Sequence, residues 1–422
     1  MKKIFTILTF LTATSIFATD RYVDPNLSSG NGTTLFTNIT SAVAAAVNGD
    51  RIIVSSNTYN EATLTISKSL KIIPQTAGTT INLNANIIIA GFTGMKFEIL
   101  GFNLGVYSIN SNIISGGDYS NRAKISIIDC SITSIDFDKN FYECNIIRNS
   151  ISQSLNFRYG NVVLNTVNNI SFLDEDQNNP SGTTQKTLIT NNNISNYIFI
   201  YNNDSKLVLA NNIITNGLYL KRWYSDSSYK NKIVNNQFST SGSTQLLVST
   251  INVPVYNLIF SNNVGNISFY CGGDTGGFAG TNLNYNTMDS IYLDLGWYYT
   301  ATSNQGLTTS LFPSNDVNGV FEWSYNGFLL PHSAPAGNQP LSFINIAGTN
   351  NIIDAGNPNH DYYDIDLTIN DRGTSGGPYS SNNYVPTTNP NNSKAFIFDL
   401  DIPTDLFPGQ NVNISAKGYH KN

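Results

Sequence analysis

The sequence predicts an all-β fold, a right-handed parallel β-helix built from one coil per repeat. The first observation is a column of small polar residues spaced 19 to 26 residues apart, each followed two positions later by an apolar residue. This spacing fits one solenoid turn with loops of varying length between fixed strands. The column reads Cys130, Asn149, Asn168, Asn192, Asn211, Asn236, Asn262 and Asn286.

The second observation is that short apolar runs flank each member of this column. Upstream runs such as Ile125 to Ile128 and Leu207 to Leu209 suit buried strands. Downstream, a second alternation follows a polar turn, as in Ile135/Phe137 and Leu218/Leu220. Because no unit has apolar residues at helical spacing over ten or more positions, a helical repeat is excluded.

The repeating asparagines predict a ladder inside the coil stack. Strands of successive coils lie about 4.8 Å apart, so that identical amides can stack and hydrogen-bond from coil to coil. Cys130 occupies the same column and is expected to be a small buried side chain rather than a redox group.

Composition agrees with a secreted protein of low charge. Only 12% of the 422 residues are charged, against roughly 25% in typical globular proteins. Residues 1–18 have the pattern of a signal peptide, with two lysines before an apolar run. Without them, 20 basic residues face 28 acidic ones, a net charge of −8, which disfavours a nucleic-acid partner. We expect no transmembrane segment after the signal and a monomeric protein.

The two ends differ from the regular middle. Near the start, Ile39, Val43 and Val47 predict a short capping helix that stops at Asn48-Gly49, followed by strands. We therefore expect a β-helix domain at 19–379, with an N-terminal cap and an irregular closing segment. A linker at 380–394 and a C-terminal β segment at 395–422 complete the chain.

Several segments resemble the pectate-lyase-like superfamily of right-handed β-helix proteins. The opening segment, from Ile39 to Pro74, contains Asn48-Gly49-Asp50, Ile52-Ile53-Val54 and Thr58-Tyr59-Asn60-Glu61. Together with the Asn-Asn-x-Ile coils, the resemblance covers Asp20 to about Leu295. The segments Ile353 to Pro358 and Asp364 to Pro378 resemble the closing part of secreted bacterial members, which are frequent in the Bacteroidota. The resemblance implies the fold, whereas the activities of the superfamily are diverse.

The outward positions of the second alternation predict a strip that contacts polysaccharide. Aromatic side chains beside polar ones suit sugar rings, and members of the resembling superfamily bind glycans along a parallel sheet. The expected substrate-binding residues of the strip are Tyr201, Tyr219, Tyr270 and Tyr292.

Catalytic chemistry is less clearly indicated, and whether the protein is an enzyme stays open. A uronate lyase needs a basic side chain at the sugar C5, for which Arg158 or Lys221 are candidates. Asp136 and Asp138 could bind a cation or act as the carboxylate pair of a hydrolase, the less favoured enzyme class. The motifs of either class are missing around these residues.

A cofactor is not required by any motif, although Ca²⁺ is a candidate. Asp361, Asp364, Asp366 and Asp371 crowd into eleven residues with Asn370, but without the glycine-spaced loop of an EF-hand. The favoured alternative is a turn network with Arg372 that closes the last coil.

Three functions follow as hypotheses. The favoured one is an extracellular or cell-surface β-helix that contacts polysaccharide without a clear catalytic motif. The alternatives are a polysaccharide lyase and a purely structural, adhesin-like stalk. Ice binding would need a flat repeated Thr-x-Thr array, and the pair Thr63/Thr65 is isolated.

Overall fold

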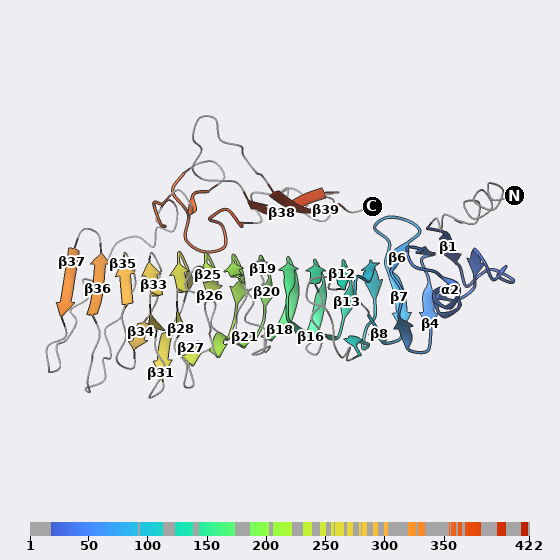
Figure 1. Cartoon of the computed structure of the whole chain (residues 1–422), viewed down its shortest axis with the longest axis horizontal. Coiled ribbons are helices and arrows are strands. Elements are labelled where there is room, and N and C mark those ends of the chain that lie inside the picture. Colours follow the sequence, from blue (N-terminus) through green and yellow to red (C-terminus); the bar gives the residue numbers. More distant parts are fainter. Residues whose placement is uncertain are drawn as a thin grey trace, which may run out of the picture.

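The computed structural model shows a long stack of parallel β-coils, so the predicted parallel β-helix is confirmed (Figure 1). It describes residues 18–91, 93–112, 123–137, 143–173, 186–201, 206–221, 231–238, 245–249, 255–256, 258–265, 268–272, 278–279, 281–284, 290–293, 299–302, 320–325, 328–333, 354, 356–359, 362–364, 368–380, 395–401 and 415–420. The expected signal peptide at 1–18 and linker at 380–394 lie almost wholly outside these ranges.

The coils form three faces, of which face 1 is a sheet of sixteen strands. All its neighbouring strands are parallel except the last pair, β36 and β37, which is antiparallel. In spatial order the strands are β2 (Leu35–Phe36), β1 (Asp20–Val23), β3 (Arg51–Val54), β6 (Leu70–Pro74), β9 (Lys96–Leu100), β12 (Lys124–Ile128), β15 (Glu143–Ile147), β17 (Gly160–Val163), β19 (Lys186–Thr190), β22 (Lys206–Ala210), β25 (Asn231–Val234), β29 (Leu258–Ser261), β33 (Thr281–Asn284), β35 (Tyr299–Thr302), β36 (Val320–Tyr325) and β37 (Phe328–Ser333).

Faces 2 and 3 belong to a second sheet, and the two long strands β16 and β18 run through both. Face 2 contains β4 (Thr58–Asn60), β7 (Ile81–Asn84), β10 (Phe102–Asn103), β13 (Ser131–Ile132), the first parts of β16 (Ser150–Phe157) and β18 (Thr166–Leu173), β20 (Asn193–Ile194), β23 (Ile213–Ile214), β26 (Gln237–Phe238) and β30 (Val264–Gly265). Face 3 contains β5 (Leu64–Ile66), β8 (Ile87–Ile89), β11 (Ile109–Ser111), β14 (Ile135–Asp136), the second parts of β16 and β18, β21 (Tyr197–Tyr201) and β24 (Gly217–Lys221).

Smaller sheets complete the described strands. Strand β24 contacts β27, which extends face 3 into a three-stranded parallel sheet. The remaining two sheets have two strands each, one parallel and one antiparallel. The strands are β27 (Gln245–Ser249), β31 (Ser268–Gly272) and β34 (Ser290–Leu293), then β28 (Val255–Tyr256) with β32 (Phe278–Ala279), and β38 (Ala395–Asp401) with β39 (Ser415–His420).

Each regular coil turns from face 1 to face 2 at one residue with positive φ. The column comprises Asp129, Arg148, Leu164, Asn191, Asn211, Asn235 and Asn262, with φ between 53° and 59°. Asparagine is the residue other than glycine that most readily adopts this left-handed conformation, because its short side chain forms local hydrogen bonds. In each asparagine pair of the repeat, the first residue therefore forms the turn and the second belongs to the ladder.

The buried ladder is formed by the residue after each turn, which corrects the predicted column. Its members are Cys130, Asn149, Asn165, Asn192, Asn212, Asn236 and Asn263, spaced 19, 16, 27, 20, 24 and 27 residues apart. From Asn149 on, each Nδ2 donates to the Oδ1 of the next ladder asparagine at 2.9 to 3.0 Å. The predicted members Asn168, Asn211 and Asn262 are wrong, since Asn168 lies on the outer side of face 2 and the other two form turns.

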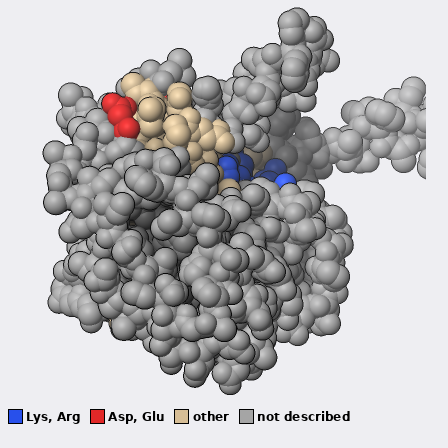
Figure 2. Space-filling view, turned by 90° about the vertical axis from the view of Figure 1, so that its left-hand side faces the viewer, with Lys and Arg blue, Asp and Glu red and all other residues tan. Residues whose placement is uncertain are grey.

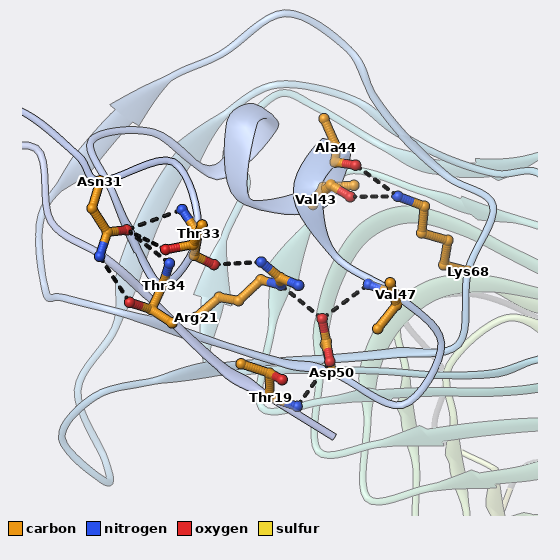
Figure 3. Close-up of polar contacts among 10 residues, drawn as sticks. All are labelled: Thr19, Arg21, Asn31, Thr33, Thr34, Val43, Ala44, Val47, Asp50 and Lys68. Carbon is orange, nitrogen blue, oxygen red and sulfur yellow. Dashed lines mark hydrogen bonds and ion pairs between the residues drawn. The ribbon is translucent and has the colours of Figure 1, made fainter. Parts of the chain in front are cut away.

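The N-terminal end carries the predicted helix, α2 (Ile39–Ala45), which packs against β1, β2 and β3. Asn38 caps its start by accepting from the backbone N–H of Ser41, and Nζ of Lys68 donates to the carbonyls of Val43 and Ala44 at its end (Figure 3). Val47, expected on the buried face, is 43% exposed because the helix ends before it. Among the described residues, no helix is long and apolar enough to span a bilayer.

Residues 354–380, which we call the strap, lie along the outside of the coils. Asn191 Nδ2 donates to the carbonyl of Tyr379, and Asn211 Nδ2 donates to those of Thr374 and Gly376. In the end-on view of Figure 2 the described residues in sight are mostly uncharged, with acidic atoms at the left edge and basic atoms at the right. The expectation that this segment closes the last coil is wrong, because the strap runs back over coils in the middle of the chain.

The strap also covers apolar side chains on the outer side of face 1. Tyr362 is buried against a cluster that includes Val208, Val234 and Ile259, and Tyr379 packs against the same cluster. Lys232 and Lys186 lie over the rings of these two tyrosines, at 5.5 and 5.0 Å from Nζ to the ring centre. Cation–π contacts therefore add to the burial of the two rings.

Candidate functional site

Three aromatic side chains form a cluster on the outer side of face 3. The rings of Phe199 and Tyr219, on neighbouring coils, are stacked with centroids 5.0 Å apart and planes 11° apart. Tyr197 lies against both rings, at 5.7 Å from Phe199 and 5.3 Å from Tyr219. Such pairs are worth roughly 0.5–1.5 kcal/mol beyond their buried area, so the cluster is a rigid apolar platform.

Alternation along the two strands directs these rings outward. Ile198, Ile200, Leu218 and Leu220 are fully buried, so the residues between them face away from the core. Tyr197 pairs in register with Gly217, which has no side chain. Its ring can therefore reach across to Tyr219 on the neighbouring strand.

The hydroxyl of Tyr219 is protonated at neutral pH, as in any ordinary tyrosine, and its surroundings shift its pKa further upward. Burial raises the pKa of Tyr219 above its ordinary value of 10.0, and the neighbouring Tyr197 raises it further. A protonated phenol both donates and accepts hydrogen bonds. The cluster thus combines an apolar surface with a neutral hydroxyl that can contact a polar ligand.

Polar side chains continue the row toward the N-terminus. Phe199 pairs with Ser171, Ser171 with Asn156, and Asn156 with Asp136. Ile135, Leu155 and Ile170, which alternate with them, are fully buried. One elongated strip therefore runs from Asp136 to Tyr219, polar at one end and aromatic at the other.

The predicted sugar-binding tyrosines lie on β21, β24, β31 and β34. Tyr219 belongs to the cluster, and the backbone of Tyr201 pairs with that of Lys221 on the next strand. Tyr270 and Tyr292 pair with each other across β31 and β34, although their side chains lie outside the described part. Tyr197 was not predicted from the sequence. It lies two residues before Phe199 on the same strand, so that strand alternation places both side chains on the same face and could have revealed it.

The catalytic candidates that the structure describes lie on several coils of face 3. Asp136 is half-buried on β14, and Arg158 is half-buried directly after β16. Arg158 and Lys221 are three strands apart, which corresponds to about 14 Å at the spacing of parallel strands. Asp138 and the side chain of Lys221 lie outside the described residues. The two basic candidates therefore belong to different coils.

The acidic segment of the strap uses its described carboxylates for backbone contacts. Asp364 accepts from the N–H groups of Gly377 and Asp371, and Asp371 accepts from that of Asp354. Asp361 and Asp366 lie outside the described residues. Within the ranges that the structure covers, no three carboxylate, histidine or cysteine side chains group closely enough to hold a metal ion.

The comparisons with known proteins leave this geometry to be interpreted by itself. No protein-family model, no curated protein and no solved structure matched the chain. The aromatic and polar strip of face 3, on a parallel β-helix, is therefore the feature from which function is argued.

Proposed function

We propose that this is a secreted or cell-surface β-helix protein that binds polysaccharide along the strip of face 3. The observation that carries the proposal is the platform of Tyr197, Phe199 and Tyr219 on adjacent coils. Flat apolar rings beside hydroxyl and amide groups suit pyranose rings, which have apolar faces and polar edges. The signal-like residues 1–18 support export, and the β-helix supports a relation to the pectate-lyase-like superfamily.

The register of the strands supports a polymer rather than a single sugar. Phe199 on β21 and Tyr292 on β34 are separated by four strand spacings, which corresponds to about 19 Å across the strands. Tyrosines recur along this distance at β24, β31 and β34. A row of this length offers several consecutive contacts to an extended chain, so that weak single contacts add up.

The test is binding to a panel of neutral and acidic polysaccharides by affinity electrophoresis, with Phe199→Ala and Tyr219→Ala variants. We expect each variant to weaken binding about tenfold, as for the central aromatic residues of an interface. Tyr22→Ala is the matched control, because Tyr22 is a 41% exposed tyrosine on β1 of face 1. Unchanged binding in both face 3 variants would contradict the proposal.

The same samples test the catalytic alternative. Unsaturated and new reducing ends are followed together during incubation with Ca²⁺. If the wild type forms unsaturated products and an Arg158→Ala or a Lys221→Ala variant does not, the protein is a polysaccharide lyase rather than a noncatalytic binding protein. Absence of both binding and cleavage would favour the structural, adhesin-like stalk.

A further inference from the structure

The outer side of face 2 carries two columns of short side chains, which we call the polar array. In each coil the residue two positions after the ladder member is buried, and its two neighbours face outward. The first column is a continuous register of Thr58, Asn82, Asn103, Ser131, Ser150, Thr166, Asn193, Ile213 and Gln237, beyond which the next residue in register is the apolar Val264. The second comprises Asn60, Asn84, Gly105, Thr133, Ser152, Asn168, Ser195 and Thr215.

The chemistry of the polar array is uniform. Every described member is exposed or half-buried, and none is charged or aromatic. Apart from Ile213 and Gly105, all are serine, threonine, asparagine or glutamine, which both donate and accept hydrogen bonds. This uniformity sets the array apart from face 3, with its aromatic cluster, and from face 1, which carries ion pairs such as Lys71–Glu98 and Lys124–Glu143.

Contacts between coils hold the side chains of the array in place. Asn103 Nδ2 donates to Asn82 Oδ1 at 3.0 Å, and Asn84 Nδ2 donates to Asn60 Oδ1 at 2.6 Å. Ser195 Oγ donates to Asn168 Oδ1 at 3.1 Å. The asparagine ladder lies at the border of the same face, so the backbone beneath is rigid as well. A preordered surface loses little conformational entropy when a ligand binds.

The described turns that border the polar array are short. Face 1 passes to face 2 through two-residue turns such as Asn191-Asn192 and Asn235-Asn236. Turns from face 2 to face 3 are also short, as at Asn196 and Asn216. The chain passes from face 3 to face 1 between the end of β11 and the start of β12, and between the end of β24 and the start of β25, at the corner away from the polar array. The described contacts of the strap are with the turn column and face 1.

The array has a fixed two-dimensional period. Its rows repeat at about 4.8 Å, the spacing of strands, and its columns are two residues or about 6.6 Å apart. A ligand that matches it must itself be periodic, flat and uncharged, and must both donate and accept hydrogen bonds. Anionic polymers do not meet these conditions because the array has no cation, and the array offers no aromatic platform to a sugar ring. A lattice of water molecules meets all of them.

We propose that the polar array binds the surface of ice. Hydroxyl and amide groups at fixed spacing hold a layer of ordered water, which joins the lattice of the crystal. Binding by this face is independent of polysaccharide binding by face 3, so either can fail without the other. Ice binding was expected from the sequence to need a repeated Thr-x-Thr array, and the polar array is not of that kind. The proposal departs from that requirement and rests on serine, threonine, asparagine and glutamine side chains in register, whose columns follow from the corrected ladder.

The experiment is partition of the full chain into slowly growing ice, with serum albumin as the excluded reference and inhibition of ice recrystallisation as a second readout. Thr166→Arg and Ser150→Arg place a long charged side chain in the middle of the array. Thr65→Arg is the matched control, an exposed threonine on β5 of face 3. Thermal midpoints of all variants show that each is folded.

We expect the wild type to enter the ice and each array variant to be about tenfold depleted from it, as for the loss of a central contact. Thr65→Arg and Tyr219→Ala should enter the ice as the wild type does. Exclusion of the wild type from ice would overturn the proposal. Equal depletion in Thr65→Arg, or capture by crystalline cellulose or chitin without ice binding, would overturn it too.

Discussion

Arg21 and Asp50 form a buried ion pair at the N-terminal end of the coil stack, with 2.7 Å between Nε and Oδ2 (Figure 3). Asp50 also accepts from the backbone N–H groups of Thr19 and Val47, at 2.8 and 2.9 Å. Nη1 of Arg21 donates to the carbonyl of Thr33, in the loop where Asn31 Oδ1 accepts three backbone N–H groups. The pair thus joins β1, the loop before β2 and the turn after α2.

Substitution of Asp50 should therefore destabilise the cap strongly. Asp50→Asn leaves a buried guanidinium without its counter-charge, which typically costs about 3–5 kcal/mol. Urea unfolding followed by circular dichroism measures this loss. The control is Asp20→Asn, whose partner Arg51 is half exposed, because an exposed pair is worth about 0–1 kcal/mol. Equal losses in the two variants would show that burial does not matter here.

The same pair predicts a dependence of stability on pH. Burial alone would raise the pKa of Asp50, but the hydrogen bonds from Val47, Thr19 and Arg21 outweigh it and hold the pKa below its ordinary value of 3.8. A lowered pKa in the folded state stabilises the protein above pH 3.8, and this stabilisation is lost as the pH falls through the folded-state pKa. The difference in unfolding free energy between wild type and Asp50→Asn should shrink below about pH 4. A constant difference down to pH 2 would contradict this.

Leucine substitutions at a buried ladder asparagine and at an exposed asparagine should differ in their effect on stability. Asn212 accepts from Asn192 and donates to Asn236 and to the carbonyls of Ile189 and Ala210. Asn212→Leu leaves several of these buried groups unsatisfied, and at about 1–3 kcal/mol each we expect a loss of roughly 3 kcal/mol. The exposed Asn193 is the control, since Asn193→Leu should change stability by less than about 0.5 kcal/mol. Thermal unfolding compares the two, and similar midpoints would argue against a buried ladder.

The regular features of the fold could be predicted because they depend on local chemistry. Alternation identified inward residues such as Ile198 and Leu218, and the repeat identified the coils. The register of the ladder could not be fixed where two asparagines precede two apolar residues, as in Asn211-Asn212-Ile213-Ile214. Only the left-handed backbone of Asn211 decides which amide is buried. The strap was mispredicted because its contacts span 95 to 188 residues, beyond any local pattern.

One substitution in the turn column should weaken the attachment of the strap to the coils. Asn235 Nδ2 donates to Asn370 Oδ1 and to the carbonyl of Asp371, and its own φ is 57°. Asn235→Gly removes the side chain and keeps a backbone that glycine adopts without strain. Hydrogen exchange should then accelerate at Gly373 and Gly377 while the ladder amide of Asn212 stays protected. Unchanged exchange in the strap would show that its other contacts, including those of Asn191, Asn211 and Tyr362, are sufficient to hold it.

The two cysteines whose side chains the structure describes should be unreactive in the folded protein. Cys130 and Cys144 are buried and not joined in a disulfide. Burial is the largest cause that raises the pKa of Cys130 to about 12, and burial likewise raises the pKa of Cys144. Because the thiolate is the reactive form, neither should react with iodoacetamide at pH 8 before unfolding. Peptide mapping after labelling in native buffer and in guanidinium chloride distinguishes the sites, and native labelling of Cys130 would show that the first regular coils open to solvent.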